Sequence, residues 1–208
     1  PSGCGETQYD SDSGNNFTAT FSILSAGACG TSVNFDGYDY ETVQIGEQCW
    51  FAENLRTTVY ADGTAIPEVT DQGTWNWLSS GARCDYNHNA SNAAFYGRLY
   101  NWYAADDPRG LCPSGWHVPS DEEWTNLENY ITSQNFNGTE GTALKATSGW
   151  IAGGNGTDDF GFSALPGGRR WTGLGFIDAG EAGNWWSTTI SGVPPTMPDS
   201  YLIKMRAL

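Results

Sequence analysis

The sequence predicts an α+β domain with short strands, two short helices and long loops rich in glycine and tryptophan. The 208-residue chain contains 27 Gly and 10 Trp, and glycine at that level indicates many tight turns. Two segments have strand signals, and one of them has an apolar residue at every second position. A third segment has both a capping signal and a helical apolar face. The length suits a single domain with a sizeable core.

The first predicted strand runs over residues 17–24, between glycine-containing segments. Its threonines and serine alternate with apolar residues, which places on one face Phe17, Ala19, Phe21 and Ile23. We therefore divide the chain into an extended N-terminal segment with one strand, residues 1–30, and a domain, residues 31–208.

Within the domain, residues 40–45 form the second predicted strand, which Gly46 ends. Residues 93–105 combine aromatic residues at mixed helical spacing, and we interpret them as a short buried helix that ends before Pro108. Residues 57–92 and most of the chain beyond residue 150 are expected to be loops and short strands.

The clearest helix signal covers residues 120–133. Ser120 and Glu123 have the spacing of a capping box, in which each side chain accepts a hydrogen bond from the other residue's backbone N–H. Behind them, Trp124, Leu127 and Ile131 fall on one helical face. This face is expected to pack into the core.

The charge balance excludes two classes of partner. Nine Lys and Arg oppose 24 Asp and Glu, a net charge of −15, so neither nucleic acid nor an anionic membrane is an expected partner. No apolar run approaches the ~20 residues of a membrane span. The acidity fits solubility outside a cell, with divalent cation binding as the sharper alternative.

Five scattered cysteines lie in no CxxC pair, so they do not indicate zinc or redox chemistry. They suit an oxidising compartment. We predict a disulfide between Cys29 and Cys49, which flank the first strand of the domain, and a second between Cys84 and Cys112, which bracket the aromatic segment. Cys4 is then the odd cysteine.

Several motifs occur in a familiar order: TVQIGEQCWFAENLRTTVYADGTAIP, FYGRLYNWYAA, GLCPSGWHVPSDEEWTNLENYI, GFSALPGGRR and GNWWSTT. Together they resemble the Fibrobacter succinogenes major paralogous domain, from about residue 31 to about residue 190. The resemblance implies a C-type-lectin-like fold, similar to that of the formylglycine-generating enzymes, with a small twisted antiparallel sheet. It also implies a bacterial surface protein, because the family occurs in lipoproteins and adhesins of Bacteroidetes and related bacteria.

The chain departs from the family pattern at its end. Family members continue to a terminal strand resembling GFSVRC, whereas this chain stops soon after Met205. We therefore expect that strand to be missing or supplied from elsewhere. The missing strand would have carried the family's rival partner for Cys112.

We expect no catalysis. The formylglycine-generating enzymes use a cysteine pair late in the chain, and no cysteine follows Cys112. The chain has two histidines, His88 and His117, and neither lies in a recognisable triad or nucleophile-elbow motif. The resemblance explains His117 as packing at a helix entry.

Three kinds of binding or modification site remain as candidates, and no cofactor is expected unless calcium binds. Asn155, Asp158 and Asp159 lie on a glycine-rich loop that suits calcium, or simply forms turns. An exposed aromatic face for a glycan or a cell-surface ligand is sought at Trp75 and Trp77, which would share one face of a strand, and at Trp185, if Trp186 is core. The alternative is that these indoles fill the core. Four asparagines lie in Asn-x-Ser/Thr sequons and are candidate glycosylation sites: Asn16, Asn89, Asn137 and Asn155.

The function we predict is a non-catalytic, secreted cell-surface protein that assembles with itself into a fibre. The N-terminal strand would enter the neighbouring subunit through Phe17, Ala19, Phe21 and Ile23, and Cys4 would lock that contact. The alternative is a monomeric adhesin or carbohydrate-binding lectin-like module, in which the N-terminal strand pairs within its own chain. The expected core comprises Trp50, Leu55, Tyr100, Trp102, Trp116, Trp124, Leu127, Phe162, Leu165 and Trp186.

Overall fold

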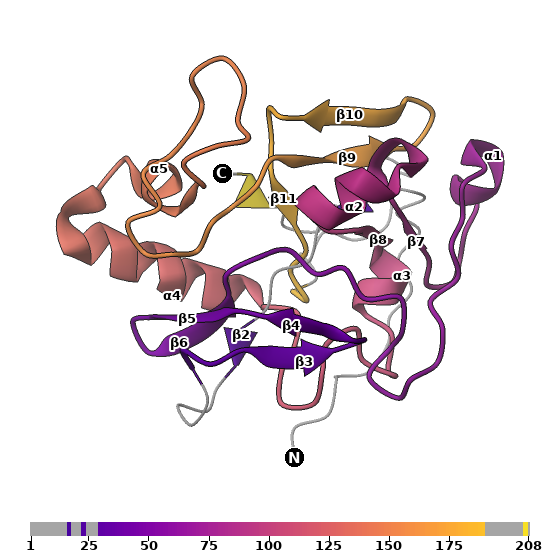
Figure 1. Cartoon of the computed structure of the whole chain (residues 1–208), viewed down its shortest axis with the longest axis horizontal. Coiled ribbons are helices and arrows are strands. Elements are labelled where there is room, and N and C mark those ends of the chain that lie inside the picture. The colour runs from indigo at the N-terminus through magenta and orange to yellow at the C-terminus, as the bar shows by residue number, and fades with distance from the viewer. Residues whose placement is uncertain (1–15, 18–21, 24–28, 190–205, 208) are drawn as a thin grey trace.

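The computed structural model describes residues 16–17, 22–23, 29–189 and 206–207. It has the predicted mixture of short helices and small antiparallel sheets (Figure 1). The helices are α1 (Gln72–Trp75), α2 (Ala90–Tyr96), α3 (Trp102–Ala105), α4 (Asp121–Ile131) and α5 (Glu140–Leu144). The strands are β1 (Asn16–Phe17), β2 (Ser22–Ile23), β3 (Val33–Phe35), β4 (Tyr38–Tyr40), β5 (Thr42–Ile45), β6 (Gln48–Phe51), β7 (Arg83–Cys84), β8 (Leu99–Asn101), β9 (Gly167–Trp171), β10 (Gly175–Ala179), β11 (Asn184–Trp185) and β12 (Arg206–Ala207).

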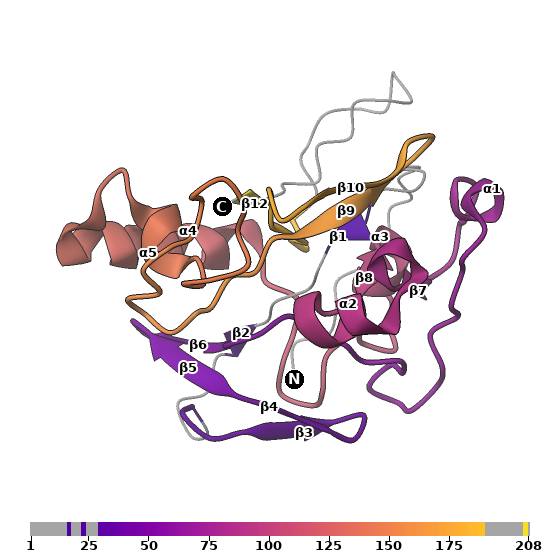
Figure 2. The ribbon, with the colours of Figure 1, turned by 45° about the horizontal axis from the view of Figure 1, so that its top comes forward.

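The strands form one five-stranded sheet and three smaller sheets. The largest has the order β10-β9-β1-β8-β7, and the next has the order β2-β6-β5. Two two-stranded sheets, β3-β4 and β11-β12, complete the set among the described residues. Every pairing between these strands is antiparallel. Figure 2 shows the β9–β10 hairpin reaching toward α1, away from α4 and α5.

Both short N-terminal strands pair within the chain. β1 lies between β8 and β9, with Asn16 opposite both Asn101 and Arg170. β2 pairs with β6, with Ile23 opposite Cys49. The other residues that we assigned to an intermolecular contact, Cys4, Ala19 and Phe21, lie outside the described residues.

The last strand corrects one expectation. β12 pairs with β11, with Arg206 opposite Trp185. The strand that we expected to be missing near the end of the domain is therefore present, and β11 is not left open on that side.

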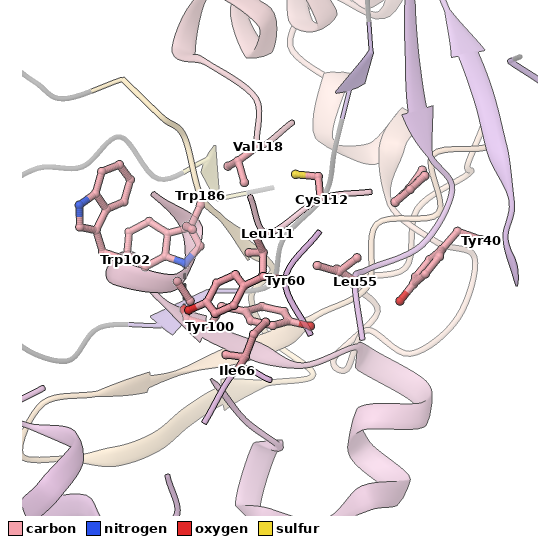
Figure 3. Packing of buried hydrophobic residues seen from close by; sticks show 13 residues of the cluster. Tyr40, Leu55, Tyr60, Ile66, Tyr100, Trp102, Leu111, Cys112, Val118 and Trp186 are labelled. Carbon is pink, nitrogen blue, oxygen red and sulfur yellow. Dashed lines mark hydrogen bonds between the residues drawn. The ribbon is translucent and has the colours of Figure 1, made fainter. Parts of the chain in front are cut away.

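Aromatic residues dominate two large cores. One core gathers Tyr40, Tyr60, Tyr100, Trp102 and Trp186, with Leu55 and Leu111 between them (Figure 3). The other is built around Trp50, Trp124, Phe162 and Trp185. Of the ten expected core residues, Trp116 and Leu165 are partly buried and the rest are buried.

The helix α4 confirms the capping prediction. Ser120 accepts a hydrogen bond from the N–H of Glu123, and the carboxylate of Glu123 accepts one from the N–H of Ser120. Trp124, Leu127 and Ile131 are buried, as their spacing predicts. The indole Nε1 of Trp124 donates to the backbone oxygen of Trp186 over 3.2 Å, which ties the helix to the residue that follows β11.

The interpretation of residues 93–105 as one helix is wrong. The segment contains the end of α2, the buried strand β8 and α3. The break falls at Gly97, where φ is +79° and a Cβ would lie 2.6 Å from Cβ of Asn54 and 2.7 Å from the backbone oxygen of Leu55. A helix cannot pass through this conformation, so the chain turns and enters the sheet. The predicted strand 40–45 is also divided, between β4 and β5.

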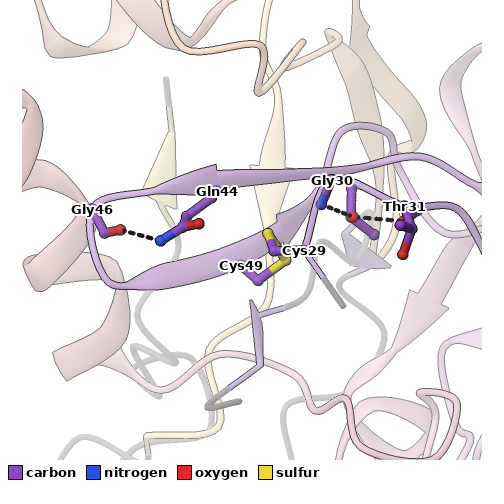
Figure 4. The surroundings of a disulfide bond; sticks show 7 residues. Cys29, Gly30, Thr31, Gln44, Gly46 and Cys49 are labelled. Atoms are coloured by element: carbon purple, nitrogen blue, oxygen red, sulfur yellow. Dashed lines mark hydrogen bonds between the residues drawn. A yellow bond between two sulfur atoms is a disulfide. The ribbon is translucent and has the colours of Figure 1, made fainter. Parts of the chain in front are cut away.

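The disulfide between Cys29 and Cys49 is confirmed (Figure 4). Beside it, the hydroxyl of Thr42 accepts a hydrogen bond from the N–H of Gly30 and donates one to the backbone oxygen of Thr31. The disulfide and these hydrogen bonds hold residues 29–31, where the domain begins, against the β5–β6 hairpin.

The second predicted disulfide is wrong. Cys84 and Cys112 are buried thiols in separate apolar clusters. Cys84 lies on β7 beside Trp75, Ala82 and Leu99. Burial raises the pKa of the Cys84 thiol to about 12, although Arg170 acts in the opposite direction. The two cysteines do bracket the aromatic segment in sequence, but its turn at Gly97 directs them to different clusters.

Candidate functional site

The candidate site is the surface formed by α1 and the residues that follow it. Asp71 caps this short helix, because its Oδ1 accepts hydrogen bonds from both the N–H and the hydroxyl of Thr74, 2.7 Å each. These bonds lower the pKa of Asp71. The backbone oxygens of Asp71 and Thr74 then accept from Trp75 and Trp77. The local sequence therefore fixes the backbone on which Trp77 stands.

A buried arginine attaches this loop to the sheet. Arg170 on β9 is fully buried and donates to the backbone oxygens of Val69 and Thr70, over 2.7 and 2.8 Å, and to Oε1 of Gln72 over 2.9 Å. Its guanidinium carbon also lies 4.5 Å from the ring centroid of Trp75. Three oxygen acceptors and an aromatic face compensate for the burial of this cation.

Trp75 and Trp77 do not share a face, which corrects the prediction. Trp75 is fully buried, whereas 84% of Trp77 is exposed. The reason is local conformation: residues two apart share a face in a strand but lie on opposite sides of a helix. Trp75 and the partly buried Leu78, three residues apart, both face the small cluster that contains Cys84. Trp77 lies between these two anchors in sequence and projects into solvent.

Trp185 is also buried, so it is not a surface platform. The expectation that one of Trp185 and Trp186 is exposed assumed that one face of their strand meets solvent. Both are buried, because Trp185 packs in one core and Trp186 in the other. The end of β11 and the residue that follows it lie between two cores, so neither indole meets solvent.

The loop proposed for calcium uses its polar groups in hydrogen bonds. Oδ1 of Asn155 accepts from the N–H of Trp150 over 3.0 Å. The carboxylate of Asp158 accepts from the N–H and the hydroxyl of Ser163, 2.7 Å each, and Asp159 accepts from the hydroxyl of Thr157. These are the contacts of the turn-forming alternative. Among the described residues, no group of three His, Cys, Asp or Glu is placed to hold a metal ion, and calcium binding stays a prediction.

The two histidines have structural contacts. Nε2 of His117 lies 2.6 Å from Oε1 of Glu123, the carboxylate that caps α4. Burial acts to raise the pKa of Glu123, but the hydrogen bonds from His117 and Ser120 outweigh it and bring the pKa down to about 2. The ring of His88 packs edge-on against Phe176, with centroids 4.9 Å apart.

The sequons lie on the surface wherever their side chains are described. Asn89, Asn137 and Asn155 are exposed, and Asn16 lies in β1. Oδ1 of Asn89 accepts from the N–H of Ser91 at the start of α2. Exposure is necessary for glycosylation, which stays a prediction at all four positions.

Comparison with known families assigns the chain. The model of the Fibrobacter succinogenes major domain matches residues 43–204. The chain belongs to this family. Comparisons with curated proteins and with solved structures gave no match. The family match begins within β5, so β1 and β2 lie outside it, although both pair with strands of the domain. No helix in the described part of the chain is long and apolar enough to cross a membrane.

Sequence reasoning missed the residues that build the α1 surface. Gln72 bridges Asn76 and the backbone of Trp171, and Arg170 holds the preceding loop, 98 to 101 residues away in sequence. Arginine is rarely buried, so Arg170 reads as a surface residue in the sequence. The Asp71 cap was detectable, because Asp precedes Thr74 at capping distance.

Proposed function

We propose that this chain is a non-catalytic extracellular surface protein that assembles into a fibre through its N-terminal strand. One observation carries the proposal: β1 lies outside the family match yet occupies the centre of the five-stranded sheet. Without β1, that sheet would separate into the pairs β10-β9 and β8-β7. Their facing edges would present unpaired backbone groups.

A central strand that lies outside the family domain can be exchanged between copies. The same backbone hydrogen bonds form whether the strand belongs to the same chain or to a neighbouring copy. If each subunit donates its strand to the next, the contact is head-to-tail and extends into a filament. β2, six residues further on, pairs with a second sheet and would add to the same contact.

Two further observations support an extracellular, non-catalytic role. The Cys29–Cys49 disulfide suits an oxidising compartment. The residues with the most reactive side chains in the described part have structural roles: His117 joins a helix cap, and Cys84 is a buried thiol whose pKa is raised. The family and the mixed α+β architecture are in keeping with a C-type-lectin-like fold, which we include in the proposal.

A photo-crosslinking experiment tests strand donation. Phe17 is replaced by p-benzoylphenylalanine in the full chain, and ¹⁴N- and ¹⁵N-labelled preparations are unfolded, mixed and refolded together. If strands are donated, irradiation gives crosslinked products of mixed isotopic mass, and negative-stain images show filaments. The matched control carries the same photoreactive residue at Trp77, which is 84% exposed and lies outside the sheet.

The contrary result is equally clear. Crosslinks found only within single chains, together with monomeric particles at all concentrations, would show that β1 pairs only with strands of its own chain. The protein would then be the monomeric surface module that we hold as the alternative.

A further inference from the structure

Trp77 is an exception among the tryptophans of this chain. Among the described residues, Trp50, Trp75, Trp124, Trp185 and Trp186 are fully buried, while 84% of Trp77 is exposed. Large aromatic side chains stabilise a fold mainly when they are buried. An indole that remains in solvent contributes little to folding and keeps its face free for a ligand.

The backbone beneath Trp77 is held firmly. Asp71 caps α1, Trp75 and Leu78 pack inward on either side of Trp77, and Arg170 clamps the preceding loop. The backbone from which the indole projects is therefore held in place. A site whose backbone is already ordered loses less conformational entropy when it binds a ligand.

The residues before and after Trp77 in the sequence carry groups that can form hydrogen bonds with a ligand. Oδ1 of Asn76 accepts from Nε2 of Gln72 over 2.7 Å, which orients the amide and leaves Nδ2 of Asn76 as a donor. The exposed neighbours in sequence carry hydroxyls or a carboxylate: Thr70, Asp71, Thr74, Ser79 and Ser80.

The turn of the β9–β10 hairpin adds a second apolar group at the same end of the molecule. Gln72 donates to the backbone oxygen of Trp171, which also accepts from the N–H of Leu174. Leu174 is 70% exposed. In Figures 1 and 2, α1 stands beside this turn. The surface thus offers isolated apolar groups among many polar ones, rather than the continuous patch of a stable protein interface, about 800 Å² on each partner.

We propose that Trp77 is the stacking platform of a binding site for neutral polysaccharides. The C–H face of a pyranose ring would lie on the indole, and its hydroxyls would bond with Asn76 and the neighbouring hydroxyls. The net charge of −15 argues against uronic-acid or sulfated polymers, which it would repel. The site is formed within one subunit and includes no residue of β1 or β2, so polysaccharide binding can be measured separately from assembly. β1 does lie next to the support of the site, because Asn16 is opposite Arg170, which holds the loop before Trp77.

Binding is measured with the full chain and named probes. Retention on microcrystalline cellulose, insoluble xylan, mannan and chitin identifies the polymer, and calorimetry with the matching hexasaccharide gives a Kd. We expect retention on at least one polymer, with Trp77→Ala weakening the Kd by about tenfold or more. Trp77→Phe should retain much of the affinity because it keeps a ring, and Asn76→Ala should weaken binding.

Ile151→Ala is the matched control, because Ile151 is 53% exposed and its N–H bonds with Gly180 at the other end of β10. Its Kd should stay within about twofold of the wild-type value. The proposal fails if the wild-type chain is retained on none of the four polymers, or if Trp77→Ala binds as tightly as Ile151→Ala. Loss of assembly in Trp77→Ala, without any polysaccharide binding by the wild type, would assign the indole to a protein contact instead.

Discussion

The indole Nε1 of Trp185 donates a hydrogen bond to Oδ1 of Asn54 over 2.9 Å, although 131 residues separate the two in sequence. Both side chains are buried. The amide of Asn54 also donates to the backbone oxygen of Tyr96 over 2.8 Å, beside the turn at Gly97. One amide therefore connects β11, the loop after β6 and the end of α2.

Replacement of Asn54 by Ala should be strongly destabilising. It removes the acceptor of a buried indole N–H and the donor to a backbone carbonyl, and each buried group left unsatisfied costs about 1–3 kcal/mol. We expect the free energy of unfolding to fall by about 2–5 kcal/mol, measured by urea denaturation. Asn129→Ala, at an exposed position of α4, is the control and should change stability by less than about 0.5 kcal/mol. Similar unfolding midpoints for the two variants would show that the buried amide is dispensable.

The sequence predicted the features that depend on neighbouring residues. The capping box of α4, its buried face and the Cys29–Cys49 pair were all found from local spacing. It failed where distant parts of the chain decide the outcome. Gly97 turns the aromatic segment because Asn54 and Leu55 occupy the adjacent space, and Trp185 is buried because a second core covers the other face of its strand.

At the candidate site, too, some features follow from neighbouring residues and others depend on distant parts of the chain. The exposure of Trp77 depends on a choice between helix and strand for only a few residues, which periodicity does not settle. A strand would place Trp75 and Trp77 together, and the helix separates them. The Asp71 cap favours the helix, but the clamp by Arg170 joins segments about 100 residues apart and leaves no local pattern.

Trp124→Ala should cost about 3–5 kcal/mol of unfolding free energy. The indole of Trp124 is buried, lies 4.9 Å from the ring of Trp50 and donates to the backbone of Trp186. Its removal creates a cavity and deletes the hydrogen bond to that oxygen. Asn126→Ala, on the exposed side of the same helix, is the matched control. A native-like denaturation midpoint for Trp124→Ala would mean that the helical face is assigned wrongly.

Stability should fall in acid because of Glu123. Its pKa in the folded protein is about 2, below the ordinary value of 4.5, so the unfolded chain binds the proton more tightly. The stabilisation is therefore complete above pH 4.5 and is lost as the pH falls from about 4.5 through about 2. Its upper limit is about 3.5 kcal/mol, since one pKa unit is worth about 1.4 kcal/mol. Glu123→Gln should be less stable than wild type at neutral pH, and the difference should shrink toward pH 2. A difference that stays constant across this range would rule out the linkage.

Chelation is expected to leave the fold unchanged. The polar groups of Asn155, Asp158 and Asp159 accept hydrogen bonds within their own loop region. Thermal unfolding of the protein before and after dialysis against EDTA should give the same Tm. A fall in Tm that added calcium reverses would instead establish the calcium site, and Asp158→Asn would then test its position.

Reduction of the Cys29–Cys49 disulfide should destabilise the protein by about 3 kcal/mol, because the bond closes a loop of roughly 20 residues in the unfolded chain. The effect should extend to the N-terminal strands, since Ile23 of β2 lies opposite Cys49 in the sheet.

The double variant Cys29→Ser, Cys49→Ser is compared with wild type by urea denaturation, and amide hydrogen exchange follows β2 and β6. Cys84→Ala is a useful control for the loss of a thiol elsewhere: it leaves the disulfide intact, and its small cavity should not alter exchange in β2. Faster exchange at β6 in the double variant, with β8 little changed, is the expected pattern. Uniform acceleration across both sheets would show that the bond stabilises the whole fold and has no special role in holding the N-terminal segment.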